Sequence, residues 1–307
     1  MGNEGPAVTT PSVTGFRALD REFPQVSLLM TTRNCREALK KTLSSVLTQD
    51  YPAIEIVIKD GDSTDGTVDV IRDFEAELKR RKEEADRAAS EGDSAAAGKN
   101  HRGVISGWSL IWESGPDSGL YDGMNRAVEM SHGEILGVCN DRFTRGDAVS
   151  LLVETLLSEN ADAVHADLVY MDGKVCKRFW HMGKGNIRTG WMPAHPALYV
   201  RRSVYERYGD YDISMKSSSD YDFMIRILKD GTLKLAYIPK VLISMYWGGT
   251  SNAGLPGYLR NMKEAWKALV KNGIPFPAMI IFLRILRTLR QYTLAKQWQK
   301  RKNPYCC

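Results

Sequence analysis

The first third of the chain alternates short apolar runs with segments of helical periodicity. Residues 26–31 and 54–59 are apolar runs that predict buried strands, and residues 36–49 between them place leucine and valine side chains on one face of a helix. An order of strand, helix and strand is typical of a parallel sheet flanked by helices. We therefore expect an α/β fold with a mostly parallel central sheet, whose ligands bind at the carboxyl ends of the strands.

The later part of the chain continues with further strands and helices. The remaining predicted strands are residues 109–112, 135–139, 163–170, 174–179, 197–200, 233–238 and 241–246. The remaining predicted helices are residues 67–82, 120–131, 146–160, 203–208, 219–229, 257–272 and 277–299. Asp172-Gly173 is a favourable turn pair and predicts a hairpin, whereas Pro239 predicts a break between the last two strands.

Charge and composition divide the chain into segments. The formal net charge is +5, but no acidic residue follows Glu264 and nine basic residues do, so residues 1–264 carry 33 basic and 37 acidic groups. The basic excess belongs to the end of the chain, which argues against a nucleic-acid partner for the whole protein. We expect an N-terminal tail (residues 1–22), a catalytic domain (23–256) with a flexible, highly charged insertion (79–102), and a basic helical segment (257–307).

The cysteine pattern and the hydropathy of the chain indicate its cellular compartment. The five cysteines are scattered, without the spacing of a zinc site, and read as reduced thiols. Residues 1–22 lack the apolar stretch of a signal peptide, and no run of about 18 apolar residues predicts a membrane-spanning helix. We therefore expect a cytoplasmic protein.

Four polar clusters follow predicted strands. They are residues 31–34 (TTRN), 60–67 (DGDSTDGT), 113–126 (ESGPDSGLYDGMNR) and 140–142 (NDR). Helix capping by Thr64 or Asp65 explains the end of the second cluster but not Asp60 at its start. The order and spacing of the four clusters resemble the family 2 glycosyltransferases with the GT-A fold, especially the bacterial branch that builds surface polysaccharides. The likeness covers about residues 26–251, and the third cluster is its most specific part.

The resemblance assigns a nucleotide-sugar donor to the first three clusters. The donor-binding residues that it implies are Thr31, Arg33, Asn34, Asp60, Asp117, Gly119, Asp122 and Asn125. Asp60 would accept a hydrogen bond from the base, a contact that favours uracil. Gly119 would let the backbone approach the donor closely.

The fourth cluster is where the family holds its metal ion. By resemblance, Asp141 would bind the Mg²⁺ or Mn²⁺ that neutralises charge on the leaving diphosphate. The family normally supplies two carboxylates here, and this chain has Asn140-Asp141-Arg142 with only one. Arg142 either adds positive charge beside the diphosphate or points to solvent.

Two later segments imply the catalytic base and its neighbours. Asp220 in Asp220-Tyr221-Asp222 matches the family's base, which takes the proton of the acceptor hydroxyl. Asp222 is the second candidate, and a helix cap is an alternative role for either residue. His195 either contacts the diphosphate, metal or acceptor, or is a hydrogen-bonded core histidine. Trp247 and Ser251 belong to a segment similar to the family's late Gly-Gly-x-Ser motif, which we assign to the acceptor or the diphosphate.

The last predicted helix combines apolar and basic positions. Ile281, Ile285, Leu289 and Tyr292 lie near one face, and Arg284, Arg287 and Arg290 lie toward another. This pattern indicates a helix that lies in a membrane interface, although packing on the protein body with the arginines in water is the alternative.

The resemblance implies an inverting glycosyltransferase that moves one hexosyl or N-acetylhexosaminyl group from a UDP-sugar. Its acceptor would be a lipid-linked glycan of polysaccharide biosynthesis, met at the inner face of the membrane. The Gln-x-x-Arg-Trp motif and the membrane helices of processive synthases are absent, which favours transfer of a single sugar. The competing prediction is a non-catalytic subunit that binds sugar nucleotides at the membrane, because the metal motif is shortened.

Overall fold

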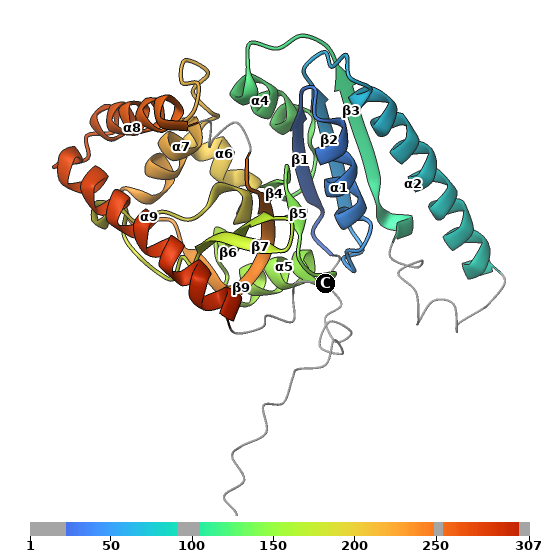
Figure 1. Cartoon of the computed structure of the whole chain (residues 1–307). Helices are drawn as coiled ribbons and strands as arrows, with labels where there is room; N and C mark the ends of the chain where they lie inside the picture. Colours follow the sequence, from blue (N-terminus) through green and yellow to red (C-terminus); the bar gives the residue numbers. More distant parts are fainter. Residues whose placement is uncertain (1–22, 91–104, 249–253, 301–307) are drawn as a thin grey trace, which may run out of the picture.

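One mixed sheet with helices on both faces forms the protein (Figure 1). The computed structural model describes residues 23–90, 105–248 and 254–300. The strands are β1 (Val26–Thr32), β2 (Ile54–Asp60), β3 (Ser109–Ser114), β4 (Ile135–Val138), β5 (Arg142–Phe143), β6 (Ala163–Asp172), β7 (Val175–Trp180), β8 (Leu198–Arg201) and β9 (Leu235–Tyr246). The α-helices are α1 (Arg36–Val46), α2 (Thr67–Ser90), α4 (Leu120–Met130), α5 (Ala148–Ser158), α6 (Arg202–Tyr208), α7 (Ser219–Leu228), α8 (Gly254–Lys271) and α9 (Pro277–Lys300). Short 3₁₀ turns are η3 (Ile105–Gly107), η4 (Ile187–Thr189) and η5 (His195–Ala197).

The sheet has a parallel part and a mixed part. Its strand order is β3-β2-β1-β4-β8-β6-β9-β5, with β7 paired to β6. The pairs β1–β2, β1–β4 and β2–β3 are parallel, as the alternation of strands and helices predicts. Beyond β4, strand β8 runs antiparallel between β4 and β6, and β6 is parallel to β9. Strands β1, β2 and β4 therefore end at one edge, where the polar clusters begin.

Both faces of the sheet are buried because helices cover each of them. Leu28 and Met30 of β1 point into a core with α1, α2 and α5, whereas Leu29 between them points into a second core with α4, α6, α7, α8 and α9. This alternation follows from the two-residue period of a strand. It explains why β1 reads as a continuous apolar run.

The predicted hairpin is confirmed and the predicted break at Pro239 is wrong. Strands β6 and β7 pair antiparallel around Gly173, whose φ of 56° suits a glycine. Strand β9 continues through Pro239, because its register against β6 steps from Ala166↔Ile238 to Asp167↔Val241. The two skipped residues, Pro239 and Lys240, form an irregularity in which a proline needs no ladder hydrogen bond.

The predicted insertion at 79–102 is partly wrong. Helix α2 continues to Ser90, and ion pairs of Arg80 with Glu77 and Glu84 support it at helical spacing. Lys82 also donates to the carbonyl of Trp108 at 2.8 Å. Residues 79–90 are therefore an ordered extension of a helix, since charge along a helix face is compatible with helical structure. Residues 91–102 of the prediction, and the tail 1–22, lie outside the described residues.

The two closing helices form where the sequence predicts them. Helix α9 packs along β7 and against η4, and its buried residues are Ile280, Gln291 and Ala295. Its outer side exposes a row of large apolar side chains, Met279, Phe282, Leu286 and Leu289, which we call the α9 outer stripe. Of the predicted apolar face, Ile281 and Ile285 are only half-exposed. No helix in the described ranges is both long and apolar enough to span a membrane.

Candidate active site

The carboxylate of Asp60 joins the ends of the first three strands. Its side chain is completely buried, and it accepts hydrogen bonds from Thr32 Oγ1 (2.9 Å), Ser63 Oγ (2.6 Å), Ser63 N (2.9 Å) and Ser114 Oγ (2.7 Å). Burial would raise the pKa of Asp60, but the bonds from Ser63, Ser114 and Thr32 outweigh it and hold the pKa below its usual value. Four bonds occupy both oxygens, so Asp60 offers the base no free acceptor in this conformation. The predicted base contact is replaced by a scaffolding role.

Thr31 and Asn34 also connect loops. The Thr31 amide donates to Asn140 Oδ1 at 2.9 Å, and Asn140 Nδ2 donates to Thr31 Oγ1 at 3.0 Å. Asn34, in a left-handed conformation with φ of 47°, receives the Thr64 amide on Oδ1 at 2.9 Å. Both residues therefore hold the strand-end loops in place, and their side chains are already committed to protein partners.

Arg33, Gly61 and Asp117 meet from three different loops. A Cβ atom on Gly61 would lie 2.6 Å from Asp117 Oδ2 and 3.5 Å from Arg33 Cδ, so a side chain at this position would displace the Asp117 carboxylate. Asp117 Oδ1 receives the Gly119 amide at 3.1 Å, and Gly119 itself has a φ of 137°. No described residue donates a hydrogen bond to Asp117 Oδ2. We call Arg33, Gly61 and Asp117 the donor trio. Its two predicted members, Arg33 and Asp117, keep more side-chain atoms available for a ligand than the other predicted donor residues do.

Asp122 and Asn125 are committed to the protein. Asp122 Oδ2 accepts from Ser118 N (2.8 Å) and Ser118 Oγ (2.9 Å), which closes the loop before α4. Asn125 exchanges two 2.9 Å hydrogen bonds with the backbone of Tyr211. The structure therefore assigns both residues to positioning, in contrast to the predicted direct contact with the donor.

Asp220 has the geometry of an oriented base. It lies half-buried in the first turn of α7, and Tyr121 donates its hydroxyl to Asp220 Oδ1 at 3.0 Å. The Tyr221 amide also donates to Oδ1, at 2.9 Å, and Oδ2 accepts from no described residue. Burial first, and then the charge of Asp220, raises the pKa of Tyr121, so this hydroxyl stays protonated. One oxygen of Asp220 is therefore fixed and the other can receive a proton.

Asp222 does not have the geometry of the second candidate base or of a residue at the acceptor or diphosphate. Its side chain is fully buried, pairs with Arg226 at 3.0 Å and accepts from Asn272 Nδ2 at 2.8 Å. Lys271 adds a second cation at 3.5 Å. Three partners from α7 and α8 surround the carboxylate, so it joins the two helices, and the helical period turns it away from Asp220 two residues earlier.

His195 is a buried, hydrogen-bonded histidine. Its Nε2 lies 2.7 Å from the Tyr211 hydroxyl, which lies 2.7 Å from the Tyr205 hydroxyl. Burial lowers the pKa of His195, and the charge of Asp220 opposes this shift. The side chain is therefore neutral at physiological pH and matches the core-histidine alternative, while the electrostatic effect of Asp220 shows that it lies near the base.

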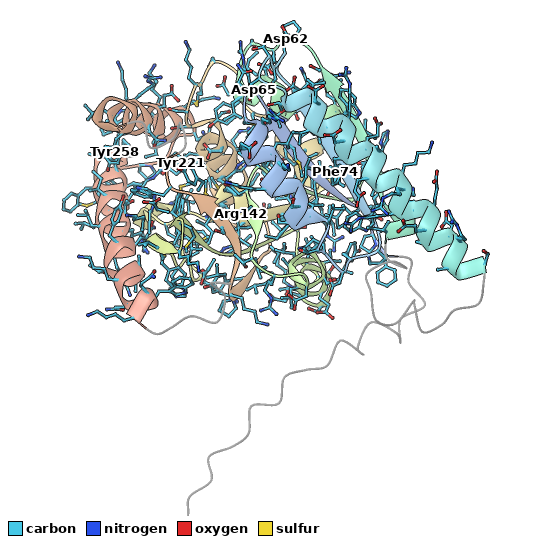
Figure 2. The ribbon with its side chains drawn as sticks, turned by 45° about the vertical axis from the view of Figure 1, so that its right-hand side comes forward. Asp62, Asp65, Phe74, Arg142, Tyr221 and Tyr258 are labelled. Atoms are coloured by element: carbon cyan, nitrogen blue, oxygen red, sulfur yellow. The ribbon has the colours of Figure 1, made fainter. Side chains whose placement is uncertain are left out.

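Asp141 and Arg142 follow β4 at the same edge. Burial raises the pKa of Asp141 to about 7 although Arg142 opposes the shift, and no described donor reaches the carboxyl group. Arg142 is exposed and pairs through β5 with Ser244 of β9 (Figure 2). The described residues contain no cluster of three metal-ligating side chains. One carboxylate still fits a magnesium-type site, because such ions commonly take one or two carboxylates and complete their shell with substrate phosphates and water.

The structure adds an aromatic and cationic group that no sequence motif marks. The Arg178 guanidinium lies over the rings of Tyr170 (4.9 Å) and Trp180 (4.8 Å), and its Nε donates to Gln291 of α9. Burial raises the pKa of Tyr170, the charge of Arg178 opposes this shift, and the charges of Asp141 and Asp220 add to it. Cross-strand pairing of Tyr170 with Arg178 in the predicted hairpin is the signal that could have located this group.

Trp247 packs against the aromatic and cationic group around Arg178. The Trp247 ring meets Tyr170 and Tyr292 edge-on, with centroid distances of 6.2 Å and 6.1 Å. Its amide donates to the carbonyl of Met171 at 2.8 Å. Trp247 therefore packs between β6 and α9, on the side of the predicted acceptor. Ser251 lies outside the described residues.

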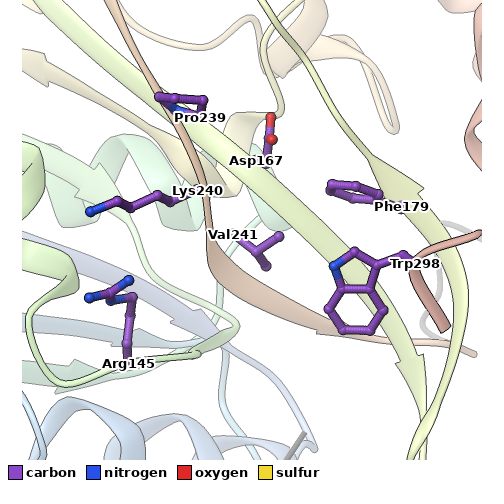
Figure 3. A pocket seen from close by; sticks show the side chains of 7 residues that line it. All are labelled: Arg145, Asp167, Phe179, Pro239, Lys240, Val241 and Trp298. Carbon is purple, nitrogen blue, oxygen red and sulfur yellow. The ribbon is translucent and has the colours of Figure 1, made fainter. Parts of the chain in front are cut away.

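A small cavity lies apart from these residues (Figure 3). Its volume is about 210 Å³, and its lining consists of Arg145, Asp167, Phe179, Pro239, Lys240, Val241 and Trp298. None of these is a predicted site residue. Asp167 is bonded to His181 (2.8 Å) and Tyr237 (2.9 Å), so its carboxylate helps to hold β6, β7 and β9 together.

Comparison with known proteins agrees with this arrangement. Residues 27–98 match the sequence profile of Glycosyl transferase family 2. A PGL/p-HBAD biosynthesis glycosyltransferase of Mycobacterium bovis is 27% identical over 243 residues, which are 75% of this chain and 80% of that protein.

Solved structures share the fold at low sequence identity. S. aureus TarS 1–349 in complex with UDP-GlcNAc has a TM-score of 0.60 and 13% identity, over 91% of this chain and 76% of that one. The mannosyltransferase PcManGT from Pyrobaculum calidifontis, in complex with GDP-Man and Mn²⁺, has a TM-score of 0.57 and 17% identity, over 92% and 76% of the two chains. The chain therefore carries a glycosyltransferase family 2 sequence region, is similar to glycosyltransferases in sequence, and has the GT-A fold.

Proposed function

We propose that this glycosyltransferase inverts the anomeric centre in one displacement, with Asp220 as the base. The observation that carries the proposal is the carboxylate itself: Tyr121 and the Tyr221 amide hold Oδ1, and Oδ2 is left for a substrate proton. The acceptor hydroxyl gives its proton to Oδ2 while its oxygen attacks the anomeric carbon. The bond between that carbon and the donor phosphate breaks, and the nucleoside diphosphate leaves with the bonding electrons.

We propose a UDP-sugar as the donor, bound between Arg33, Asp117 and Gly119. Asp117 Oδ2 is the acceptor available to ribose or sugar hydroxyls, and Gly119 lets the ligand approach the backbone. Arg33 is exposed beside them and brings positive charge to a diphosphate. The complexes of TarS with UDP-GlcNAc and of PcManGT with GDP-Man support a nucleotide-sugar donor, and the resemblance to surface-polysaccharide enzymes favours UDP.

A divalent ion, Mn²⁺ or Mg²⁺, belongs to the same proposal. Asp141 would hold it, and the ion would neutralise negative charge on the departing diphosphate. The exposed Arg142 beside it is the second positive charge available at this point. The presence of Mn²⁺ in the PcManGT complex supports the proposal.

We propose a lipid-linked glycan as the acceptor, met at the inner membrane surface. The α9 outer stripe exposes Phe282 by 56% and Leu289 by 57%, and Arg287 and Arg290 are exposed beside it. Exposed apolar side chains with neighbouring cations suit a helix lying at the surface of an anionic membrane. Residues 23–256 would then be the catalytic domain, and the segment from residue 257 would join it to the membrane.

A panel of nucleotide sugars, with and without Mn²⁺, tests the donor, the metal and catalysis together. Release of nucleoside diphosphate and transfer to a lipid-linked glycan extract are measured in parallel. We expect release from one UDP-sugar and stimulation by Mn²⁺. Binding of UDP without release or transfer under any metal would instead indicate a non-catalytic subunit.

A further inference from the structure

The inward face of α9 reaches toward the catalytic base. Arg284 and Gln291 are seven residues apart, which is about two helical turns, so they lie on the same side of the helix. The fully buried Ile280 and Ala295 belong to this side as well. Gln291 accepts the hydrogen bond of Arg178, and Arg284 lies nearer the start of the helix. Helix α9 therefore carries polar side chains on the face that packs against the body.

Arg284 ends beside the residue that follows the base. Its guanidinium carbon lies 4.1 Å from the centre of the Tyr221 ring, and Tyr221 directly follows Asp220. Its Nη1 is buried and has no hydrogen-bond partner within the described part of the chain. No carboxylate of that part pairs with Arg284 either, although many of the other arginines there do pair. The ring and a hydrogen bond of Tyr221 partly satisfy the half-buried guanidinium, but its buried Nη1 keeps a donor that a ligand can satisfy.

The position of Arg284 is tightly determined. A Cβ atom on Gly190 would lie 2.5 Å from the Arg284 amide nitrogen, so the turn after η4 packs directly on the α9 backbone. Arg287, one turn later, donates to Thr189 O at 2.9 Å and to Thr189 Oγ1 at 3.1 Å. These contacts fix the helix against the segment that leads to His195, so the guanidinium is held in place before any ligand arrives.

We propose that Arg284 binds a phosphate group of the acceptor, next to the hydroxyl that Asp220 activates. The inference rests on the proposed function, because a lipid-linked glycan is joined to its lipid through phosphate. A guanidinium is well matched to phosphate oxygens, with several N–H donors in a fixed plane. The donor trio comes from the loops after β1, β2 and β3, on the other side of the molecule from α9 (Figure 1), which assigns Arg284 to the acceptor.

The same helix then serves both parts of such an acceptor. The α9 outer stripe faces away from the body and meets the apolar lipid, and Arg284 on the inward face meets the phosphate. Because one rigid helix carries both contacts, binding at the membrane would place the phosphate at a defined distance from Asp220.

Geranyl phosphate is a suitable probe, since it combines a prenyl chain with a phosphate. It is titrated into the full-length protein saturated with UDP, by calorimetry, with geraniol as the neutral comparison. We expect Arg284→Gln to weaken geranyl phosphate binding by at least about 10-fold and Arg284→Lys to restore part of it, as charge-assisted bonds are worth about 1.5–3 kcal/mol. Arg72→Gln is the matched control, because Arg72 is exposed on α2, away from α9 and the donor site, and its change removes the same charge.

Each outcome separates this inference from the proposed function. Equal binding of geranyl phosphate by the wild type and Arg284→Gln, or equal losses in Arg284→Gln and Arg72→Gln, would overturn the role of Arg284. A weaker UDP affinity in Arg284→Gln, with geranyl phosphate binding unchanged, would also overturn it and place the residue at the donor. The UDP titration and the donor panel test the proposed function independently of Arg284. If the wild type neither bound UDP nor released it from any donor, the proposed function would be wrong, whatever the Arg284 variants show.

Discussion

The donor side and the acceptor side of the site use their polar residues differently. On the donor side, Asp60, Thr31 and Asn125 are hydrogen-bonded to other parts of the protein. On the acceptor side, Asp220 keeps a free oxygen and Arg284 keeps an unpartnered nitrogen. The comparison teaches that the residues which make the sequence motifs most recognisable are largely those that shape the loops. The atoms left for chemistry are few, and some of them come from segments without a motif.

The largest expected effect is that of Asp220→Asn. Loss of the base should lower turnover by about 10²- to 10⁴-fold. Affinity for UDP should stay unchanged, since the donor trio is untouched. The measurement is release of UDP from the donor in the presence of acceptor. Asp230→Asn, at an exposed position just after the same helix, is the control and should be as active as the wild type. Full turnover in Asp220→Asn would show that Asp220 is not the base, and the contrast between the proposed donor and acceptor sides would lose its main support.

Asp60→Ala tests the scaffolding role on the donor side. It removes the acceptor of four hydrogen bonds in a buried place, and we expect a loss of about 2–4 kcal/mol in the free energy of unfolding. Chemical denaturation measures the change. Asp73→Ala, at an exposed position of α2, should change it by less than about 0.5 kcal/mol. If Asp60→Ala kept full stability and lost only UDP binding, Asp60 would be a ligand contact after all.

The α9 outer stripe predicts how strongly the protein partitions onto membranes. Replacing Phe282 and Leu286 by serine should lower binding to anionic vesicles by about 10-fold or more, because each side chain contributes about 1.5 kcal/mol or more when buried. Vesicle sedimentation measures the bound fraction. Leu157→Ser, an exposed apolar position on α5, is the control. Equal partitioning of all variants would contradict the assignment of α9 to the membrane.

Tyr121→Phe sharpens the account of the base. Removing the hydroxyl that holds Asp220 Oδ1 should lower kcat by about 10-fold, with little change in the KM of the donor. Tyr121 orients Asp220 without touching the reacting atoms. Its loss should therefore change both the value of kcat and the dependence of kcat on pH. An unchanged pH profile with a lower kcat would indicate that Tyr121 acts by packing alone.

The smallest effect concerns the docking of α8. A hydrogen bond from Lys271, first among several causes, lowers the pKa of Asp212 to about 2. The folded pKa lies below the usual value, so this stabilisation is present above about pH 4 and disappears as the pH falls toward 2. Because both side chains are partly exposed, we expect about 1 kcal/mol. Lys271→Met should flatten this part of the stability profile measured by denaturation, and an unaltered profile would speak against the pair.

Sequence patterns located the edge of the sheet and nominated Asp220 as the base, but they did not show which of the neighbouring carboxylates is buried. Asp220 and Asp222 look equivalent in the motif, yet one is half-exposed and the other is fully buried against Arg226. The difference arises from the helical period, which turns residues two apart to different sides. The sequence does not predict Arg178 and places Arg284 at the membrane or in water, because each contacts a residue that is distant in the chain, Gln291 for Arg178 and Tyr221 for Arg284.

The sequence by itself determined the alternation of strands and helices, the family and the candidate base, since these depend on local periodicity and on motif spacing. Only the tertiary structure decided which polar atoms remain without partners. That outcome depends on contacts between segments far apart, such as Thr32 and Ser114 closing on Asp60, or α9 bringing Arg284 to Tyr221. Local patterns carry no information about such pairings, because a hydrogen bond is satisfied by whatever group folding places within reach.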